Sequence, residues 1–228
     1  MKQLLKTILV FFFITAHVVG LLAQYQGYIR YKTYNGQNNM TTYNKVYFNK
    51  EVSLFVRGDQ EEKILENEPL RKKTVTYQYV EYYRDTKKKI GIKQKKLSDK
   101  KFVRTEFKEE APIWTITNEK KKIKDYNCKK AVCQHPLFGE IVAWFTESIP
   151  VSVGTPSAWG LPGIVLEVSG GKGDYTDTVD SIVFEPVDKE KLYPTEGELL
   201  PEDKYASSKS DADSWLEKIE KAFNLGND

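Results

Sequence analysis

Short runs rich in tyrosine and β-branched residues, each bounded by turn residues, constrain the fold of this sequence more than any other feature. The first three runs lack the 3.6-residue period of an amphipathic helix and have the composition of β-strands. The turn residues follow one another too closely for the long crossovers that parallel strands require. The runs occupy residues 25–34, 43–56, 74–83, 101–107, 112–117, 120–132, 140–146, 163–169 and 174–185. The sequence therefore predicts a mainly β fold with a curved antiparallel sheet.

The N-terminal end has the pattern of a secretory signal. Lys2 and Lys6 precede an uncharged apolar run, Thr7–Leu22, and the small residue Ala23 follows it. This run is shorter than the roughly 20 apolar residues of a membrane-spanning helix. We therefore expect export to the periplasm, the cell envelope or the medium, with residues 1–23 removed by cleavage near Ala23.

The C-terminal end has the only convincing helical pattern. Trp215, Leu216, Ile219 and Phe223 fall on one face of a helix that is expected over residues 211–224. Such a helix most simply packs its apolar face on the sheet. The sequence thus predicts one mainly β domain over residues 24–228 that ends in an amphipathic helix.

The charge is divided unevenly along the chain. Residues 24–130 hold 26 basic and 14 acidic side chains, whereas residues 131–228 hold 7 and 18. No linker rich in Pro, Gly or Ser separates the two parts, and residues 123–132 resemble one continuous strand. We therefore expect one sheet in which the early basic strands pair with the late acidic strands.

The segment Arg84–Lys101 is strongly basic, with nine basic and two acidic residues after a tyrosine-rich strand. Lysines interleaved with tyrosines can bind nucleic acid, but the export signal argues against a nucleic-acid partner. An exported basic segment can bind an anionic lipid or polysaccharide surface. It can equally be a solvated hairpin whose lysines prevent edge-to-edge aggregation.

Cys128, Cys133 and His135 lie close together in the sequence and raise the question of a metal or thiol site. Their spacing matches neither a zinc finger nor a redox motif, so we expect no metal and no cofactor. On one extended strand the two cysteines would lie about 16 Å apart. A disulfide needs Cα atoms within about 7 Å, so a Cys128–Cys133 bridge requires a turn between them. A disulfide, buried free thiols and a thiol nucleophile assisted by His135 all remain open.

The tetrapeptide Gly160–Gly163 (GLPG) is the most specific local motif. Pro162 at the second position and Gly163 at the third position are what a type II turn requires. The turn would begin the apolar strand that follows, and it comes after a loop that contains Trp159. Local physics thus explains a tight turn at this position.

The surroundings of this turn resemble those of the GLPGLI family, exported proteins of Gram-negative bacteria without an established biochemical role. The resemblance covers about 40 residues in order. It rests on Tyr126, Cys128, Lys129, Lys130, Ala131, Gly139, Ala143–Thr146, Ile149, Pro150, Gly154, Gly160–Gly163 and Leu166. The family implies no catalytic residues for this chain.

Three differences separate the chain from the family pattern. Ile164 and Val165 replace Leu-Ile, which is a conservative change in the core. Thr155 separates Gly154 from the following proline, and Cys133 is additional. Any disulfide would therefore be specific to this chain.

Three functional hypotheses follow. In the first, the sheet resembles the half-barrels of lipoprotein carriers, by fold analogy alone, and the exported, non-catalytic module binds an apolar ligand or an envelope protein. Its candidate binding residues are Trp144, Trp159, Gly160, Leu161, Pro162 and Gly163. The second is a thiol-dependent or hydrolytic enzyme that uses Cys128 or Cys133 with His135; it is the weaker one, because no nucleophile motif is present. In the third, the GLPG region is a folding corner, and charged surfaces act in an envelope complex.

Overall fold

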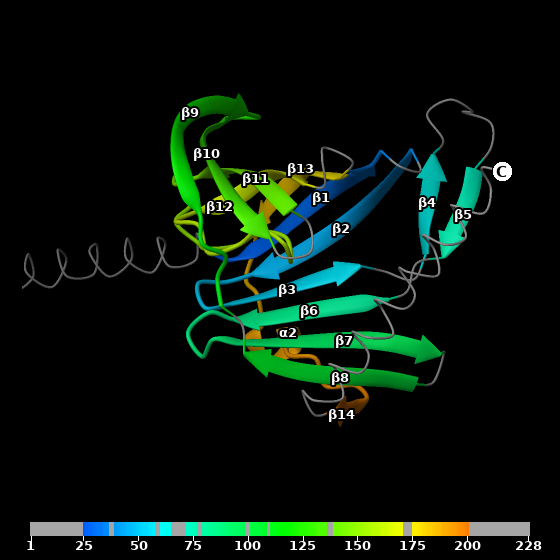
Figure 1. Cartoon of the computed structure of the whole chain (residues 1–228). Helices are drawn as coiled ribbons and strands as arrows, with labels where there is room; N and C mark the ends of the chain where they lie inside the picture. Colours follow the sequence, from blue (N-terminus) through cyan, green and yellow to red (C-terminus); the bar gives the residue numbers. More distant parts are fainter. Residues whose placement is uncertain are drawn as a thin grey trace, which may run out of the picture.

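The chain folds around a single large β-sheet that is open and strongly curved (Figure 1). The computed structural model describes residues 25–36, 39–57, 60–64, 72–76, 79–98, 101–108, 110–135, 139–170 and 175–200. The predicted mainly β fold with a curved antiparallel sheet is confirmed. The expected signal, residues 1–23, and the expected helix, residues 211–224, lie outside the described residues. In the described part of the chain, no helix has the length and apolarity needed to cross a membrane.

The elements follow the short runs of the sequence. They are β1 (Gly27–Asn35), β2 (Met40–Phe48), β3 (Val52–Arg57), β4 (Gln60–Ile64), β5 (Lys72–Thr76), β6 (Val80–Asp85), β7 (Ile90–Ser98), β8 (Lys101–Lys108), β9 (Thr115–Ile123), β10 (Tyr126–His135), β11 (Gly139–Thr146), β12 (Ile164–Gly170), β13 (Tyr175–Phe184), α2 (Lys189–Leu192) and β14 (Glu198–Leu200).

The large sheet has 12 strands in the order β14-β8-β7-β6-β3-β2-β1-β13-β12-β11-β10-β9, and β4 and β5 form a separate pair. All neighbours in the large sheet are antiparallel except β14 and β8. The ladder between β1 and β13 joins the early part of the chain to the late part, and across it Arg30 lies 3.3 Å from Asp180. An early basic strand thus pairs with a late acidic one at this ladder.

Two runs that the sequence analysis treated as single strands are hairpins, so these two predictions were wrong. The run over residues 43–56 breaks after β2, because the Asn49 side-chain oxygen accepts hydrogen bonds from the backbone N–H groups of Glu51 and Val52, both at 2.9 Å. The run over residues 120–132 breaks at Lys124, which adopts a positive φ of 51° between β9 and β10. Asn49 caps the first turn through its side chain, whereas Lys124 occupies a left-handed position that favours glycine.

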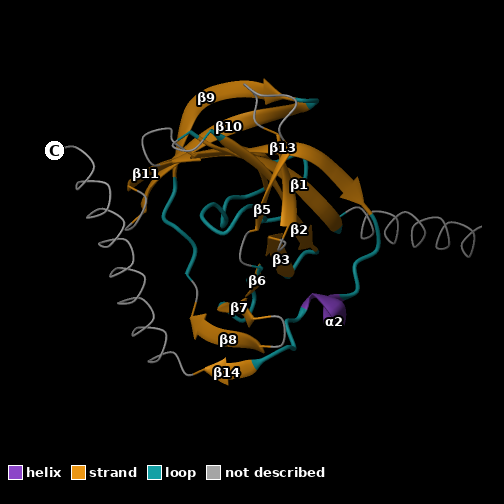
Figure 2. Cartoon of the chain, turned by 90° about the vertical axis from the view of Figure 1, so that its right-hand side faces the viewer, coloured by secondary structure: helices purple, strands orange, loops and turns teal. Residues whose placement is uncertain are grey.

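The two faces of the sheet are covered by different segments. Successive side chains of a strand point to opposite faces, so Tyr83 and Arg84 of β6 belong to different layers. On one face Tyr83 packs with Leu54 and with Leu192 of α2. On the other face Arg84 contacts the loop between β11 and β12. Figure 2 shows loop segments inside the curve of the sheet and α2 outside it.

Candidate functional site

The loop between β11 and β12, residues 147–163, forms an inner layer on the concave face of the sheet. Ile149, Val151 and Val153 are buried against Ile29 and Phe48. Two backbone hydrogen bonds fix the loop to β12: Ile164 N–H donates to the carbonyl of Ile149 at 3.3 Å and Val165 N–H to that of Val153 at 2.9 Å. The loop therefore covers the inner side of the curved sheet with its own apolar side chains (Figure 2).

The GLPG turn differs from the predicted type II turn. Gly163 N–H donates to the carbonyl of Leu161 at 2.8 Å, which is the hydrogen bond of a three-residue γ-turn around Pro162. The glycine with positive φ is Gly160, at 83°, and not Gly163. Gly163 is required instead by close approach, since a Cβ there would lie 2.0 Å from the carbonyl oxygen of Thr146. The prediction of a tight turn was right, but the type assigned to it was wrong.

Trp159 is held in place from two sides. The guanidinium carbon of Arg84 lies 4.0 Å from the centroid of its ring, and an Arg84 N–H also donates to the carbonyl of Pro156 at 3.4 Å. From the segment before β9, the indole N–H of Trp114 donates to the carbonyl of Trp159 at 2.7 Å. A cation above an aromatic ring in a buried setting is a stabilising contact. Trp159 thus connects β6 with the segment that leads to β9.

The predicted binding residues do not form one exposed site. Trp159, Leu161 and Gly163 are buried, whereas Gly160 and Pro162 are exposed. Trp144 lies apart from them: it packs against the cluster that contains Ile149, while Leu161 belongs to a second cluster. The ammonium group of Lys121 lies over the Trp144 ring, 4.4 Å from the ring centroid. Gly160 and Pro162 are thus the exposed members of this set, and Trp144 is half-buried.

A buried carboxyl group beneath the loop was missed by the sequence analysis. Asp177 of β13 is 1% exposed; it accepts a hydrogen bond from Thr33 at 2.5 Å and others from Tyr175 and Thr155. Burial raises the pKa of Asp177 to about 6, although the three hydroxyl groups act in the opposite direction. Asp177 lies two residues before the buried Val179 in β13, so the two side chains point to the same face of the sheet. This spacing is the signal in the sequence for the inward position of Asp177.

The polar groups around Asp177 also hold the loop. Asn44 donates to Thr33 at 2.7 Å, which extends the network to β2. The phenol of Tyr31 donates to the carbonyl of Val165 at 2.6 Å, and its pKa is raised well above the ordinary value by burial and by the charge of Asp177. Because Thr155 belongs to the loop, this network joins the loop to β1, β2 and β13.

The two cysteines are separate free thiols in the structure. Both are buried on β10, where Cys128 belongs to one hydrophobic cluster and Cys133 to the other. Burial raises the pKa of both thiols and lowers the pKa of His135. A raised thiol pKa reduces the thiolate fraction that a nucleophile requires. Among the described residues, no three His, Cys, Asp or Glu side chains gather as metal ligands.

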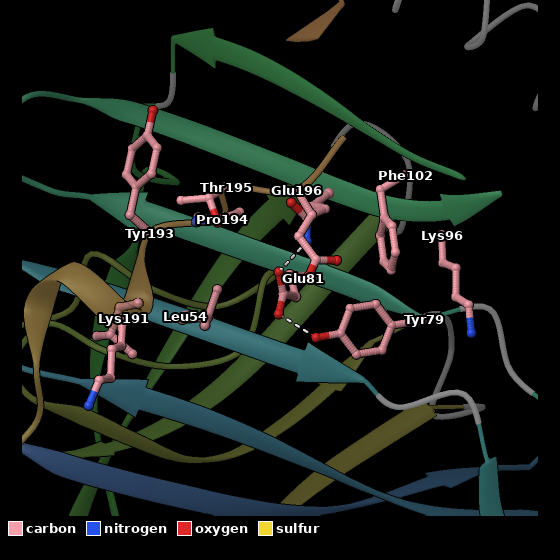
Figure 3. A pocket seen from close by; sticks show the side chains of 12 residues that line it. Leu54, Tyr79, Glu81, Lys96, Phe102, Lys191, Tyr193, Pro194, Thr195 and Glu196 are labelled. Atoms are coloured by element: carbon pink, nitrogen blue, oxygen red, sulfur yellow. Dashed lines mark hydrogen bonds between the residues drawn. The ribbon is translucent and has the colours of Figure 1, made fainter. Parts of the chain in front are cut away.

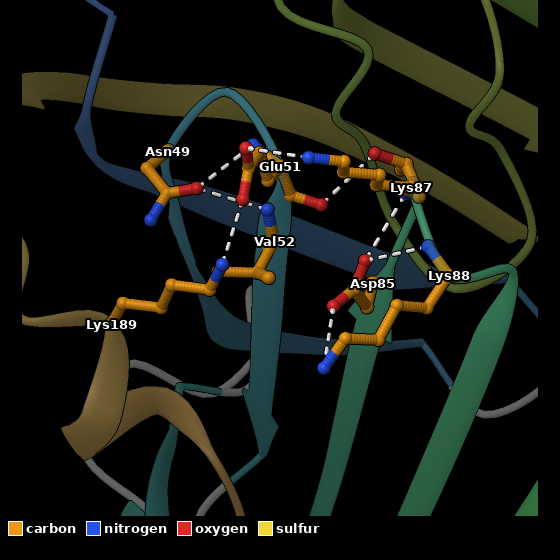
Figure 4. A network of polar contacts seen from close by, with 8 residues as sticks. Asn49, Glu51, Val52, Asp85, Lys87, Lys88 and Lys189 are labelled. Carbon is orange, nitrogen blue, oxygen red and sulfur yellow. Dashed lines mark hydrogen bonds and ion pairs between the residues drawn. The ribbon is translucent and has the colours of Figure 1, made fainter.

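The basic segment Arg84–Lys101 forms the hairpin of β6 and β7 rather than a loop. At its turn, Lys87 lies 4.0 Å from Glu51 and Lys88 lies 3.8 Å from Asp85, while Lys189 approaches Glu51 to 2.7 Å (Figure 4). The hydrogen bond and charge of Lys189 lower the pKa of Glu51. The lysines at the turn thus form ion pairs with carboxylates. Binding of an anionic surface by this segment stays a prediction.

The comparisons with known proteins concern the GLPG region and the fold. A family model described as "Protein of unknown function (Porph_ging)" matches residues 134–167, which include the GLPG turn. No curated protein matches the sequence. Two crystal forms of PNGF-II are similar in structure, with TM-scores of 0.57 and 0.56 at 17% and 18% sequence identity. In both, the similarity covers 80% of this chain and 32% of the PNGF-II chain. At this identity the likeness describes the fold.

Proposed function

We propose that this chain is an exported, non-catalytic binding module of the GLPGLI type and that it binds a protein partner. The match of the unknown-function family model to residues 134–167 supports the family assignment, because this range contains the GLPG turn and the strand before the loop. The buried, separate thiols with raised pKa argue against a cysteine nucleophile.

The observation that carries the proposal is an exposed apolar surface around the GLPG turn. We name it the corner surface and define it as Ala111, Ile113, Gly160 and Pro162. Ile113 is 93% exposed, although it lies only one residue from Trp114, which is fixed to the loop. Ala111 is exposed and adjoins Gly160, since a Cβ on Gly160 would lie 2.5 Å from the Ala111 Cβ. Exposed apolar residues that lie together mark interaction surfaces, and the corner surface is our candidate for one.

The corner surface continues into an edge strand. In the described sheet β9 is the last strand, and it follows directly after Trp114. Its first half, residues 115–118, has no lysine, and Ile116 in it is 47% exposed. An edge strand of this kind can accept an extended segment of a partner through backbone hydrogen bonds. Lysines in the second half of β9 would limit pairing with further copies of the chain.

The geometry favours a protein over a small apolar ligand at this place. Trp159 and Leu161, the large apolar residues of the turn, are 7% and 2% exposed and already packed within the protein. The residues that are left exposed here, Ala111, Ile113 and Pro162, are apolar, and they adjoin an edge strand. Such a surface suits an extended protein segment, because the segment supplies both side chains and backbone groups.

Ile113→Asp is expected to weaken partner capture about tenfold, because it places a charge in the apolar contact. The measurement is quantitative pull-down from native envelope extract with the full chain as bait. Leu199→Asp is the matched control: Leu199 is 55% exposed on β14, at the opposite edge of the sheet, and its replacement should leave the captured proteins unchanged. Equal capture by wild type and Ile113→Asp would contradict the proposed surface.

Export predicts a defined N-terminus. When the full-length chain is produced in a Gram-negative host, mass spectrometry of the intact protein should show the loss of residues 1–23. Lys2→Glu with Lys6→Glu should reduce this processing, because the basic start of a signal is removed. A protein that accumulates with Met1 intact would exclude cleavage near Ala23.

A further inference from the structure

A second site lies on the other face of the sheet, away from the corner surface. A cavity of about 270 Å³ lies between strands β3, β6, β7 and β8 and the segment 191–196. Figure 3 shows Glu81 in the middle of this cavity, with Tyr79 and Glu196 beside it. We name it the Glu81 pocket. Its volume is below the range of drug-sized sites, so it suits a small molecule or the end of a longer one.

Gln94 presents an unpaired acceptor in this pocket. The residue is 3% exposed, and its side-chain N–H₂ group donates to Glu81 at 2.8 Å. That contact fixes the orientation of the amide, because a carboxylate accepts hydrogen bonds and requires the nitrogen on its side. The amide oxygen is buried and has no hydrogen-bond partner. A buried polar atom of this kind is costly, and a ligand with an N–H or O–H group would satisfy it.

Glu81 adds a carboxyl group to the pocket, and no ion pair joins it to the other residues that the structure describes. Its two oxygens accept hydrogen bonds from the neutral groups of Tyr79 and Gln94. Burial is the main cause of its raised pKa, and the charge of Glu196 acts in the same direction. Lys96 and Lys191 lie at opposite ends of the pocket, with Glu81 between them (Figure 3). A cation between the two carboxylates would relieve their repulsion.

The other residues that line the pocket indicate which kind of cation would fit it. Tyr79 and Phe102 meet edge to face with ring centroids 6.2 Å apart, and Leu54 adds an aliphatic side chain. These residues offer an apolar wall next to the charged centre. A compact ammonium has three N–H donors, which match the three acceptor groups of Glu81, Glu196 and Gln94. A metal ion is less suited, because no set of three metal-ligating side chains occurs in the part of the chain described.

We propose that the Glu81 pocket binds a primary ammonium group on a short alkyl chain. The ammonium lies between Glu81 and Glu196 and donates to the Gln94 oxygen, while the alkyl chain contacts Tyr79 and Phe102. The group belongs to a free diamine or to a lysine side chain of a peptide. This site goes beyond the proposed function and does not depend on it, since the two surfaces lie on different faces of the sheet.

The test is an NMR titration of the isotope-labelled full chain with butylammonium at neutral pH and constant ionic strength. We expect saturable shifts of the Gln94 side-chain amide and of the Glu81 and Phe102 backbone amides. Butan-1-ol has a similar shape without the charge, and it should bind at least about tenfold more weakly. Absence of saturable shifts at these groups, or equal binding of the alcohol, would overturn the proposal.

Two further arms keep the test decisive. Glu81→Gln should weaken butylammonium binding about tenfold, whereas Glu185→Gln removes an exposed carboxylate outside the pocket and should leave it unchanged. The second arm uses the wild-type protein: acidification should weaken binding, because burial raises the pKa of Glu81, which becomes protonated while the ligand stays charged. Unchanged binding in Glu81→Gln or at acidic pH would contradict the site.

The source of the ammonium is decided by two probes. 1,4-Diaminobutane represents a free diamine, and Nα-acetyl-lysine amide represents a lysine side chain in a peptide. Tighter binding of one of them assigns the source of the ligand. Binding of neither at these groups would count against the pocket as an ammonium site.

Discussion

Gly163→Ala is expected to lower the free energy of unfolding by about 3 kcal/mol. The added Cβ would lie 2.0 Å from the carbonyl oxygen of Thr146, 2.7 Å from its carbonyl carbon and 3.2 Å from the Cα of Glu147. All three are backbone atoms, so no side-chain rotation can relieve the clash. The end of β11 or the turn itself must move, and with it the packing of the loop on β12.

Gly170→Ala is the matched control for this prediction. Gly170 is the last residue of β12, and a Cβ there would meet a side-chain carbon of Ile141 at 3.4 Å and no backbone atom nearer than 3.7 Å. We expect a change within about 1 kcal/mol, because the added methyl group fits and the unfolded chain loses some freedom. Urea denaturation of both variants measures the difference. Equal stabilities of the two variants would show that close approach at Gly163 does not constrain the corner.

The sheet could be predicted because strands are encoded locally. Tyrosine and β-branched residues at short intervals favour β structure whatever their partners are, and β1 alternates between buried and exposed positions accordingly. The hairpins at Asn49 and Lys124 could not be predicted in this way. Neither turn contains glycine or proline, and Lys124 adopts a conformation that its residue type rarely selects.

The candidate site depended on contacts that no local pattern contains. Arg84 belonged to a basic segment in the sequence, yet it is 4% exposed and hydrogen-bonded to the loop 72 residues further on. Asp177 lies in a stretch of the sequence that is rich in acidic residues, yet it is buried beneath the same loop. The GLPG motif correctly predicted a tight turn. Gly163 is required because its backbone lies close to the carbonyl group of Thr146. This contact depends on the position at which β11 ends, which no local pattern in the sequence specifies.

Asp177 should make the protein more stable in mild acid than at neutral pH, relative to an Asp177→Asn variant. Its carboxyl group has an ordinary pKa of 3.8 and a folded-state pKa of about 6, mainly because it is buried. Below the ordinary value the carboxyl group is protonated in both states, and the stabilisation is complete. Between the two values the unfolded chain releases its proton while the folded chain keeps it. Stability therefore falls as the pH rises through this range, and the full difference is about 3 kcal/mol.

Urea denaturation at a series of pH values from about 4 to about 7 measures this effect. The Asp177→Asn variant provides the reference, because its amide does not titrate. The variant also loses hydrogen bonds, but this loss is the same at every pH. It therefore does not affect the change of unfolding free energy with pH that is compared between the two proteins. Asp180→Asn is the control in the same strand: the Asp180 side chain is 37% exposed and pairs with Arg30, and this variant keeps Asp177, so the fall in stability should persist in it as in the wild type. Parallel curves for wild type and Asp177→Asn would mean that Asp177 is ionised in the folded protein throughout. Asp177 would then be a buried anion beneath the loop. The hydroxyl groups of Thr33, Tyr175 and Thr155 would lower its pKa by at least as much as burial raises it.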